Sequence, residues 1–323
     1  MLKYILKRIL ISIPLLFGIS LLTFFLIQIT PGNFFDTLKL DPQVSPQTIA
    51  HYEKLFYLDK SLFQQYWHWL KNLLHFNLGY SFYYNAPVSQ IISSRLFNTF
   101  ILSLSAMLAT WLIAIPLGIV MAVNRNRFID KFLSIISFIS LSVPSFFLAI
   151  ILLYFASKFG GLPLGGMQSA DFDQMSLLGK LLDVGRHLVI PTVVISIGAI
   201  ASLQRIMRGN LLEVLRQQYI LAARAKGLPE SRVIYKHALR NAINPLITIL
   251  GYHLSGLLSG AALIEIICSW PGIGSVMLTA VRAKDLYLVM ASMLMGGVLL
   301  FLGNLLADIM LAWVDPRIRY TDS

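Results

Sequence analysis

Residues 219–245 read YILAARAKGLPESRVIYKHALRNAINP and form a long basic, polar stretch between two apolar runs. The pattern predicts two short helices joined by a hinge. Gly227 can adopt the left-handed conformation that ends a helix, and Pro229 is tolerated in the first turn of the next one. The position of the break is therefore specified by the sequence itself.

The two predicted helices of this segment differ in character. Ala222 and Ala223 keep the first helix slim, so another backbone or a receiving groove could approach it closely. Arg232, Lys236 and Arg240 recur every four residues and form one basic stripe on the second helix. A helix-turn-helix of this kind, held close to a membrane, suits docking onto a soluble partner.

The composition places the chain among polytopic membrane proteins. Of its 323 residues, 57% are hydrophobic and 13% charged, and the mean hydropathy is +0.72. The net charge of +11 does not indicate nucleic-acid binding, because the basic residues are scattered at the ends of apolar runs. Cys268 is the single cysteine, which excludes an intrachain disulfide and a cysteine metal cluster.

Six membrane spans are expected from the apolar runs. The first, at 9–30, follows three basic residues and exceeds the roughly 20 residues needed to cross the hydrocarbon. A cleavable signal peptide is the alternative, but this run is longer than a usual signal core and lacks a clear small-x-small site. The other spans are expected at about 100–123, 133–156, 188–207, 245–267 and 287–312. Pro116 and Pro144 lie inside two of them and predict either ordinary kinks or hinges.

The chain is accordingly divided into four parts. These are an N-terminal segment with the first helix (1–30), an aromatic-rich extracytoplasmic loop (31–95), a five-helix core (96–315) containing the loop 206–242, and a tail (316–323). With six spans, 16 of the 26 Lys and Arg residues lie on the side of the termini and the remaining 10 on the other. The positive-inside rule then predicts that both termini and the 206–242 loop face the cytoplasm.

Several motifs resemble one family of transport proteins. The pattern Ala222-Ala223-x-x-x-Gly227 resembles the cytoplasmic coupling loop of binding-protein-dependent ABC importer permeases. The surrounding run looks like the dipeptide, oligopeptide and nickel branch, specifically its B-type permease subunit. Glu265-x-x-Cys-x-x-Pro271-Gly272-x-Gly274 resembles a further motif of that branch, with Cys268 where Phe is usual. Similar short elements extend the resemblance over essentially the whole chain.

The resemblance implies an all-α membrane protein with the type I ABC importer permease fold in the cytoplasmic (inner) membrane. It implies half of a translocation pathway for di- or oligopeptides delivered by an extracytoplasmic solute-binding protein. A second homologous permease and two cytoplasmic P-loop ATPase subunits are the further expected partners. The residues expected to couple to the ATPase are Ala222, Ala223, Gly227, Arg232, Lys236 and Arg240, and those expected in the pathway or gate are Glu265, Pro271, Gly272 and Gly274.

The chain carries no recognisable catalytic constellation. It has no Gly-x-x-x-x-Gly-Lys-Ser/Thr loop, no His-x-x-x-His pair and no Gly-x-Ser-x-Gly elbow. We therefore expect no enzyme activity and no cofactor in this chain, with ATP and magnesium bound by partner subunits. Glu265 either faces a substrate cavity and attracts a peptide ammonium group, or pairs locally at the interface.

Alternatives to this interpretation remain open from the sequence. A gradient-driven transporter or channel would explain the spans and Glu265 but not the coupling-like segment. An intramembrane enzyme would need His, Asp or Glu residues concentrated at one depth. The sequence does not distinguish dipeptides, longer peptides, nickel chelates and antimicrobial peptides as substrates, and it leaves hetero- and homodimeric cores open.

Overall fold

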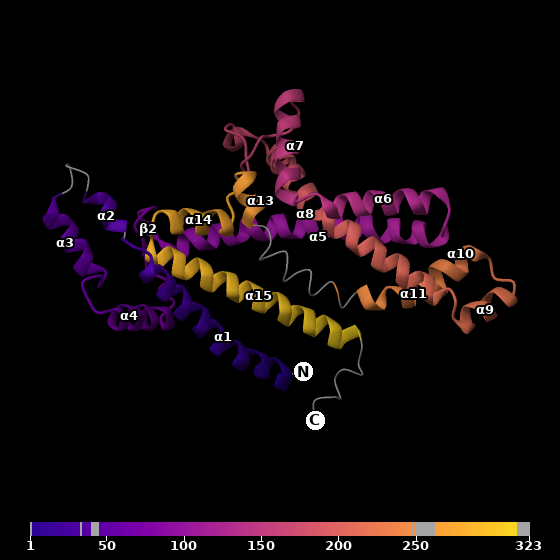
Figure 1. Ribbon diagram of the computed structural model, residues 1–323, viewed down its shortest axis with the longest axis horizontal. Coiled ribbons are helices and arrows are strands. Elements are labelled where there is room, and N and C mark those ends of the chain that lie inside the picture. The colour runs from indigo at the N-terminus through magenta and orange to yellow at the C-terminus, as the bar shows by residue number, and fades with distance from the viewer. Residues whose placement is uncertain (1, 33, 40–44, 247–248, 250–261, 315–323) are drawn as a thin grey trace. The chain divides into compact units, whose positions relative to one another are not determined.

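A computed structural model describes residues 2–32, 34–39, 45–246, 249 and 262–314 (Figure 1). The chain divides into two compact units. Unit 1 comprises Met1–Thr99 and Pro271–Phe301, and unit 2 comprises Phe100–Trp270 and Leu302–Ser323. Two long helices, α5 (Val88–Val123) and α15 (Leu286–Val314), run from one unit into the other.

Unit 1 combines long apolar helices with a small mixed lobe. Its further elements are α1 (Leu2–Ile29), α2 (Phe34–Leu38), α3 (Pro46–Leu55), α4 (Leu62–Leu74), β1 (Tyr80–Ser81), β2 (Ala86–Pro87) and α14 (Ile273–Arg282). The two strands pair antiparallel, with Tyr80 opposite Pro87. Ser45 caps α3 by accepting a hydrogen bond from the Thr48 amide, and Pro46 follows at the first helical position.

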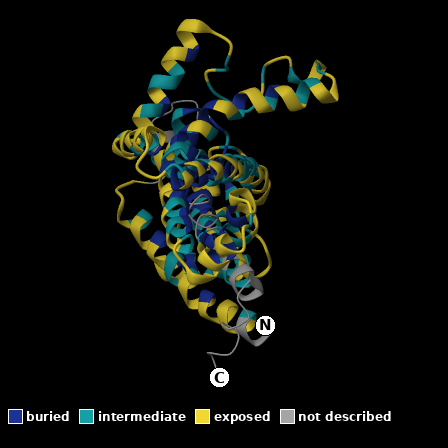
Figure 2. Ribbon diagram, turned by 90° about the vertical axis from the view of Figure 1, so that its right-hand side faces the viewer, coloured by how far each residue is buried: buried dark blue, intermediate teal, exposed yellow. Residues whose placement is uncertain are grey.

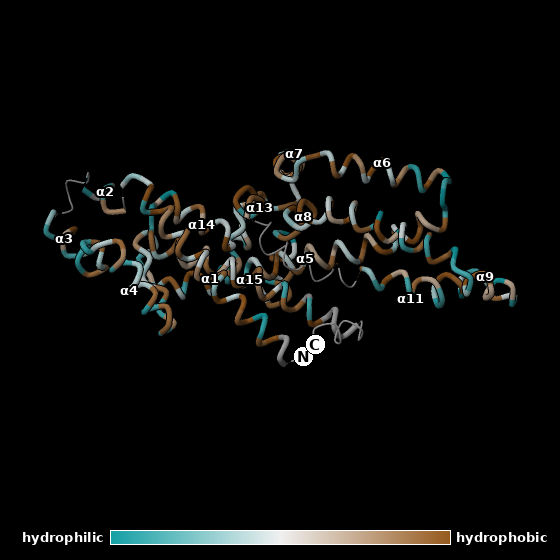
Figure 3. Tube along the Cα trace, turned by 60° about the horizontal axis from the view of Figure 1, so that its bottom comes forward, coloured by the Kyte–Doolittle hydropathy of each residue, from teal (hydrophilic) through white to brown (hydrophobic). Residues whose placement is uncertain are grey.

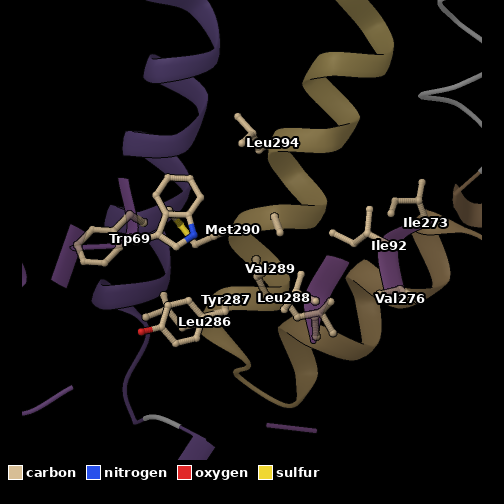
Figure 4. Packing of buried hydrophobic residues seen from close by; sticks show 14 of the residues in the cluster. Trp69, Ile92, Ile273, Val276, Leu286, Tyr287, Leu288, Val289, Met290 and Leu294 are labelled. Atoms are coloured by element: carbon tan, nitrogen blue, oxygen red, sulfur yellow. The ribbon is translucent and has the colours of Figure 1, made fainter. Parts of the chain in front are cut away.

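The core of unit 1 forms around the first turns of α15. Trp69, Tyr287 and Met290 belong to one buried cluster with residues of α1, α5 and α14 (Figure 4). Asp285, which is 0% exposed, ties this core to the β1–β2 turn: Ser81 Oγ donates to its Oδ2 at 2.7 Å and the Tyr83 amide at 3.1 Å. Residues 204 positions apart in the sequence are thus joined through one buried carboxylate.

Replacing Asp285 by alanine should lower the free energy of unfolding by about 2 kcal/mol, because the buried Ser81 hydroxyl and the Tyr83 amide lose their acceptor.

Burial raises the pKa of the Asp285 carboxyl, although its hydrogen bonds partly oppose this. The folded state therefore favours the protonated form of Asp285 more than the unfolded state does. The free energy of unfolding of wild type should accordingly rise as the pH falls toward the ordinary pKa of about 3.8. Unfolding in detergent micelles across this pH range measures both effects. A variant as stable as wild type would contradict the predicted role.

Unit 2 contains the remaining helices. They are α6 (Phe128–Ser142), α7 (Ser145–Phe159), η1 (Phe172–Gln174), α8 (Leu177–Val214), α9 (Gln218–Ala225), α10 (Glu230–Arg232), η2 (Val233–Ala238, a π-helix), α11 (Leu239–Ala242) and α13 (Ala262–Ile267). Helix α8 packs against α6 and α7. Helix α5 approaches α8 closely at Gly118, where an added Cβ would lie 2.7 Å from the Gln204 carbonyl oxygen and 2.6 Å from the Met207 Cβ.

An ion pair joins α6 to α8 inside unit 2. Arg208 donates from Nε to Asp130 Oδ1 at 2.7 Å and from Nη2 to Oδ2 at 2.8 Å. The Asp130 side chain is 4% exposed and that of Arg208 28%. The same carboxylate accepts a 2.8 Å bond from the Asn126 amide, and the Gln204 amide donates to the Ser137 hydroxyl one helical level away. These contacts join α6 to α8 through polar side chains, although the buried side-chain oxygen of Gln204 accepts no hydrogen bond from the described residues.

The predicted spans are largely recovered as helices, with one correction. Four described helices are long and apolar enough to cross a membrane: α1, α5, α8 and α15. The span expected as one helix at 133–156 is instead two, α6 and α7, which meet at Val143–Pro144 with a bend of 99° (Figure 1). Pro144 lacks an N–H and disfavours a helical conformation at the preceding residue, which explains the break.

The described helices expose apolar side chains, as expected of a membrane protein. Large apolar side chains are exposed along α1, α5, α6 and α7, among them Leu22 (64%), Leu112 (72%) and Phe128 (79%). Figure 2 shows exposed residues in yellow over much of the helical surface, and Figure 3 shows hydrophobic residues prevailing in the long helices and hydrophilic ones around α3 and α9. The span expected at 245–267 lies mostly outside the described residues, as does the tail 316–323.

Candidate functional site

The segment at 219–245 folds as the predicted pair of helical arms. Helix α9 ends at Ala225, and Gly227 has a φ of +73°, the left-handed conformation expected there. No atom lies within 4 Å of a Cβ built on Gly227, so the backbone conformation, not lack of space, favours glycine. Pro229 stands immediately before α10, which continues through η2 into α11 as the second arm.

The inner face of these arms packs against long helices of unit 2. Ile220, Val233 and Ala238 are each 0% exposed and share one apolar cluster with residues of α5 and α8. From the long helices, the buried members are Ala114, Ile119, Ala122, Leu203, Met207 and Leu211. The two arms are therefore seated on α5 and α8.

The outer face of the arms is basic and exposed. Arg232, Lys236 and Arg240 are all exposed, on the side of the second arm opposite the buried Val233 and Ala238. In the first arm, Ala222 is exposed while Ala223 is 8% exposed and packs inward. We call the exposed set Ala222, Arg232, Lys236 and Arg240 the basic face. It presents positive charge beside a slim helix, as the sequence pattern indicated.

One ion pair spans the hinge between the two arms. Arg224, on α9, donates from Nε and Nη2 to the two carboxylate oxygens of Glu230, at 3.1 and 2.5 Å. The hydrogen bonds from this guanidinium hold the pKa of the Glu230 carboxyl below its ordinary value, and the carboxylate in turn raises the pKa of Arg224. Both side chains are substantially exposed, at 38% and 55%, so solvent screens the pair.

Replacing Glu230 by glutamine should therefore destabilise the hinge by less than about 1 kcal/mol. Because the native pKa of Glu230 is lowered, its contribution is present above the ordinary value of 4.5 and is lost as the pH falls further. Hydrogen exchange of the backbone amides in 219–240 measures the change. Full loss of protection in this variant at neutral pH would show that the hinge depends on the ion pair more than on Gly227.

The predicted Pro-Gly-x-Gly turn lies in unit 1 and is fixed by α5. Asn98 donates from Nδ2 to the Pro271 carbonyl at 2.8 Å, and the Ile273 amide donates to Thr99 Oγ1 at 2.9 Å. Gly272 and Gly274 are buried, and Gly272 stands immediately before α14. The turn thus sets where α14 begins relative to α5.

Glu265 lies on α13 in unit 2 and is 0% exposed. The apolar residues beside it, Ile264 and Cys268, pack against Ala149 of α7 and Val194 of α8. Its place in a substrate pathway stays a prediction, as do the roles of Pro271, Gly272 and Gly274.

Sequence reasoning did not identify the groups that hold these elements in place. Asn98, Thr99 and Asp285 act on partners far away in the sequence, and none belongs to a short motif used above. The ion pair of Arg208 was not predicted either, because an arginine at the end of an apolar run can reach water at the interface without a carboxylate partner. Asp130 is a carboxylate at the corresponding end of the third apolar run.

Two family models together match nearly the whole chain. Residues 114–320 match the family model for the binding-protein-dependent transport system inner membrane component, and residues 1–104 match its N-terminal companion. The oligopeptide transport system permease protein AppB of Bacillus subtilis is 37% identical over 99% of this chain and 100% of its own length. The di/tripeptide transport system permease protein DppB of Pseudomonas aeruginosa is 35% identical over 99% of both chains.

Solved structures agree on the fold. An inward-facing structure of the MetNI methionine ABC transporter has a chain that matches 70% of this protein and 97% of its own length, with a TM-score of 0.55 and 18% identity. The chain thus has the type I ABC importer permease fold. With family models covering nearly its whole length, it belongs to the family of binding-protein-dependent transport system inner membrane components.

Proposed function

We propose that this chain is the transmembrane subunit of an ATP-driven importer and forms half of a translocation pathway for di- or oligopeptides. The observation that carries the proposal is the helix-turn-helix at 219–245, which exposes the basic face and buries its other side against α5 and α8. The peptide permeases named above, similar over their whole length, support the substrate class.

The proposed mechanism is mechanical. Cytoplasmic ATPases close on binding ATP and push against the basic face, and the arms pass this displacement to α5 and α8 through their shared apolar cluster. Gly227 sets the angle between the arms, so it fixes the direction in which the push is delivered. The spans then rock between outward- and inward-facing states.

The proposal includes an orientation and a set of partners. Both termini and the 219–245 segment face the cytoplasm, in accordance with the distribution of Lys and Arg. The partners are two P-loop ATPases, a second homologous permease and an extracytoplasmic solute-binding protein. ATP and magnesium are bound by the ATPases, since this chain has no phosphate-binding loop motif.

Uptake by membrane vesicles tests the proposal against the gradient-driven alternative. Vesicles with the complete complex, supplied with the solute-binding protein and a labelled peptide mixture, should accumulate peptide when ATP is present inside. A proton ionophore should not abolish this accumulation. Uptake that persists without ATP and stops with the ionophore would contradict the proposal and favour a secondary transporter.

A further inference from the structure

Helix α4 (Leu62–Leu74) presents three different stripes around its axis. Tyr66, Trp69 and Leu73 are buried or half-buried in the core of unit 1. Phe63, Trp67 and Leu74, which repeat at helical spacing, are exposed by 77%, 49% and 74%. The third stripe is polar and consists of Gln64, His68 and Asn72. A helix with separate protein-facing, apolar and polar stripes fits a position at a lipid–water boundary.

The contacts of α4 place it beside the apolar length of α1. The Tyr66 hydroxyl lies 2.8 Å from the Ser20 hydroxyl, and its ring packs 5.3 Å from that of Phe24. One residue earlier, the side-chain oxygen Oε1 of Gln65 accepts a 3.0 Å hydrogen bond from Gln28 Nε2. Ser20 lies nine residues before the end of α1, roughly 14 Å along the helix. Helix α4 is therefore held against the last turns of a membrane-spanning helix through Gln65 and Tyr66.

The exposed apolar stripe continues a lipid-facing surface. Beside the face of α1 that contacts α4, Phe17, whose ring centre lies 6.1 Å from that of Tyr66, and Leu21, one turn further along α1, are 46% and 45% exposed. These side chains belong to a helix long and apolar enough to span the membrane. Both α1 and α4 lie in unit 1, so acyl chains that cover α1 have a neighbouring apolar surface on α4.

An open groove with two lysines borders this stripe. It encloses about 390 Å³ and is lined by Tyr57, Lys60, Gln64, Trp67, His68 and Lys71. Tyr57 has a φ of +60°, which is uncommon for a bulky residue, and its ring stacks on His68 with centroids 3.8 Å apart. Lys71 Nζ lies 5.7 Å from the Trp67 ring centre. Lys60 also contacts the carboxylate of its neighbour Asp59 at 3.2 Å. Because the groove has two lysines and only one of them has this acidic neighbour, its net charge is positive.

We propose that this groove binds the headgroup of an anionic phospholipid of the outer leaflet. The phosphate lies between Lys60 and Lys71, Trp67 and Tyr57 lie at the level of the headgroup, and the acyl chains extend over Phe63 and Leu74. Tryptophan and tyrosine favour this level of the bilayer, and lysine attracts the anionic phosphate. The assignment to the outer leaflet follows from the orientation proposed above; the headgroup site itself does not depend on transport activity.

Native mass spectrometry of the purified complex, equilibrated with equal amounts of phosphatidylglycerol and phosphatidylcholine, tests this site. The wild-type complex should retain more phosphatidylglycerol than phosphatidylcholine. The double variant Lys60→Gln with Lys71→Gln should lower that retention about fivefold or more, because each lysine near the surface contributes to the attraction. The matched control, Lys54→Gln with Lys158→Gln, removes the same charge from exposed lysines outside the groove and should retain lipid as wild type does.

Further measurements distinguish other possible ligands of the groove. Phe63→Gln with Leu74→Gln should lower retention of both lipids, and excess inorganic phosphate should not displace the phosphatidylglycerol. Equal retention by wild type and the groove variant, or equal loss in the control, would overturn the proposal. Displacement by inorganic phosphate would assign the groove to a free anion. Retention by the isolated chain but not by the complex would assign this face to a partner protein.

Discussion

Gly227→Val should reduce ATP-dependent peptide uptake by about fivefold or more while leaving membrane insertion intact. Gly227 holds a φ of +73°, a conformation that costs an ordinary residue about 1–2 kcal/mol and a β-branched one more. Such a cost shifts the hinge toward other conformations by about five- to thirtyfold. The two arms then meet the ATPases at another angle, and ATP hydrolysis continues without matching uptake.

Two matched variants separate backbone conformation from bulk. Gly227→Asn should keep most of the uptake, because asparagine tolerates the left-handed conformation better than other residues with a side chain. Gly209→Val introduces the same side chain into α8, at a site where a built Cβ also meets no atom within 4 Å, and should affect uptake little. Normal accumulation by Gly227→Val, measured beside ATP hydrolysis in the same proteoliposomes, would refute the proposed role of the hinge.

Asp130→Ala should lower the free energy of unfolding by about 3 kcal/mol. The change leaves the guanidinium of Arg208, whose side chain is only 28% exposed, without the carboxylate that accepts its two hydrogen bonds. It also removes the acceptor of the Asn126 amide. Breaking one side of a partly buried ion pair is costly because the remaining charge stays partly desolvated. Unfolding in mixed detergent micelles measures the difference.

A double variant and a neighbouring arginine provide the controls. Asp130→Leu combined with Arg208→Met should recover most of the lost stability, since both charges are then absent. Arg205→Gln removes a guanidinium that lies 4.7 Å from the Phe138 ring centre and should cost only about 0.5–1 kcal/mol. A single Asp130→Ala variant no less stable than the double variant would contradict a stabilising ion pair between α6 and α8.

Local sequence signals predicted local structure well. Gly227 and Pro229 lie within three residues of each other, and the hinge that they predict is present because each residue limits its own backbone angles. Pro144 predicted a disturbance for a similar reason. Its size, a 99° bend, depends on how α6 and α7 pack against α8 and could not be derived from one run of residues.

The hydrogen bonds between distant parts of the chain could not be predicted from the sequence. Ser81 and Asp285 are separated by 204 positions, and Asn98 and Pro271 by 173. Neither pair has a spacing that periodicity or motif analysis could use, because only the folded chain brings them together. The roles of the basic face and of Glu265 stay predictions, since function depends on partners whose contacts no single chain specifies.

Co-purification tests the central claim most directly. The chain is extracted in mild detergent, and the proteins that accompany it are identified by mass spectrometry. The proposed function predicts P-loop ATPases and a second multi-span permease. It also predicts that the triple variant Arg232→Glu, Lys236→Glu, Arg240→Glu loses the ATPases but keeps the permease, because these exposed side chains form the basic face. A wild-type chain that emerges without an ATPase, under conditions that preserve known importer complexes, would contradict the claim.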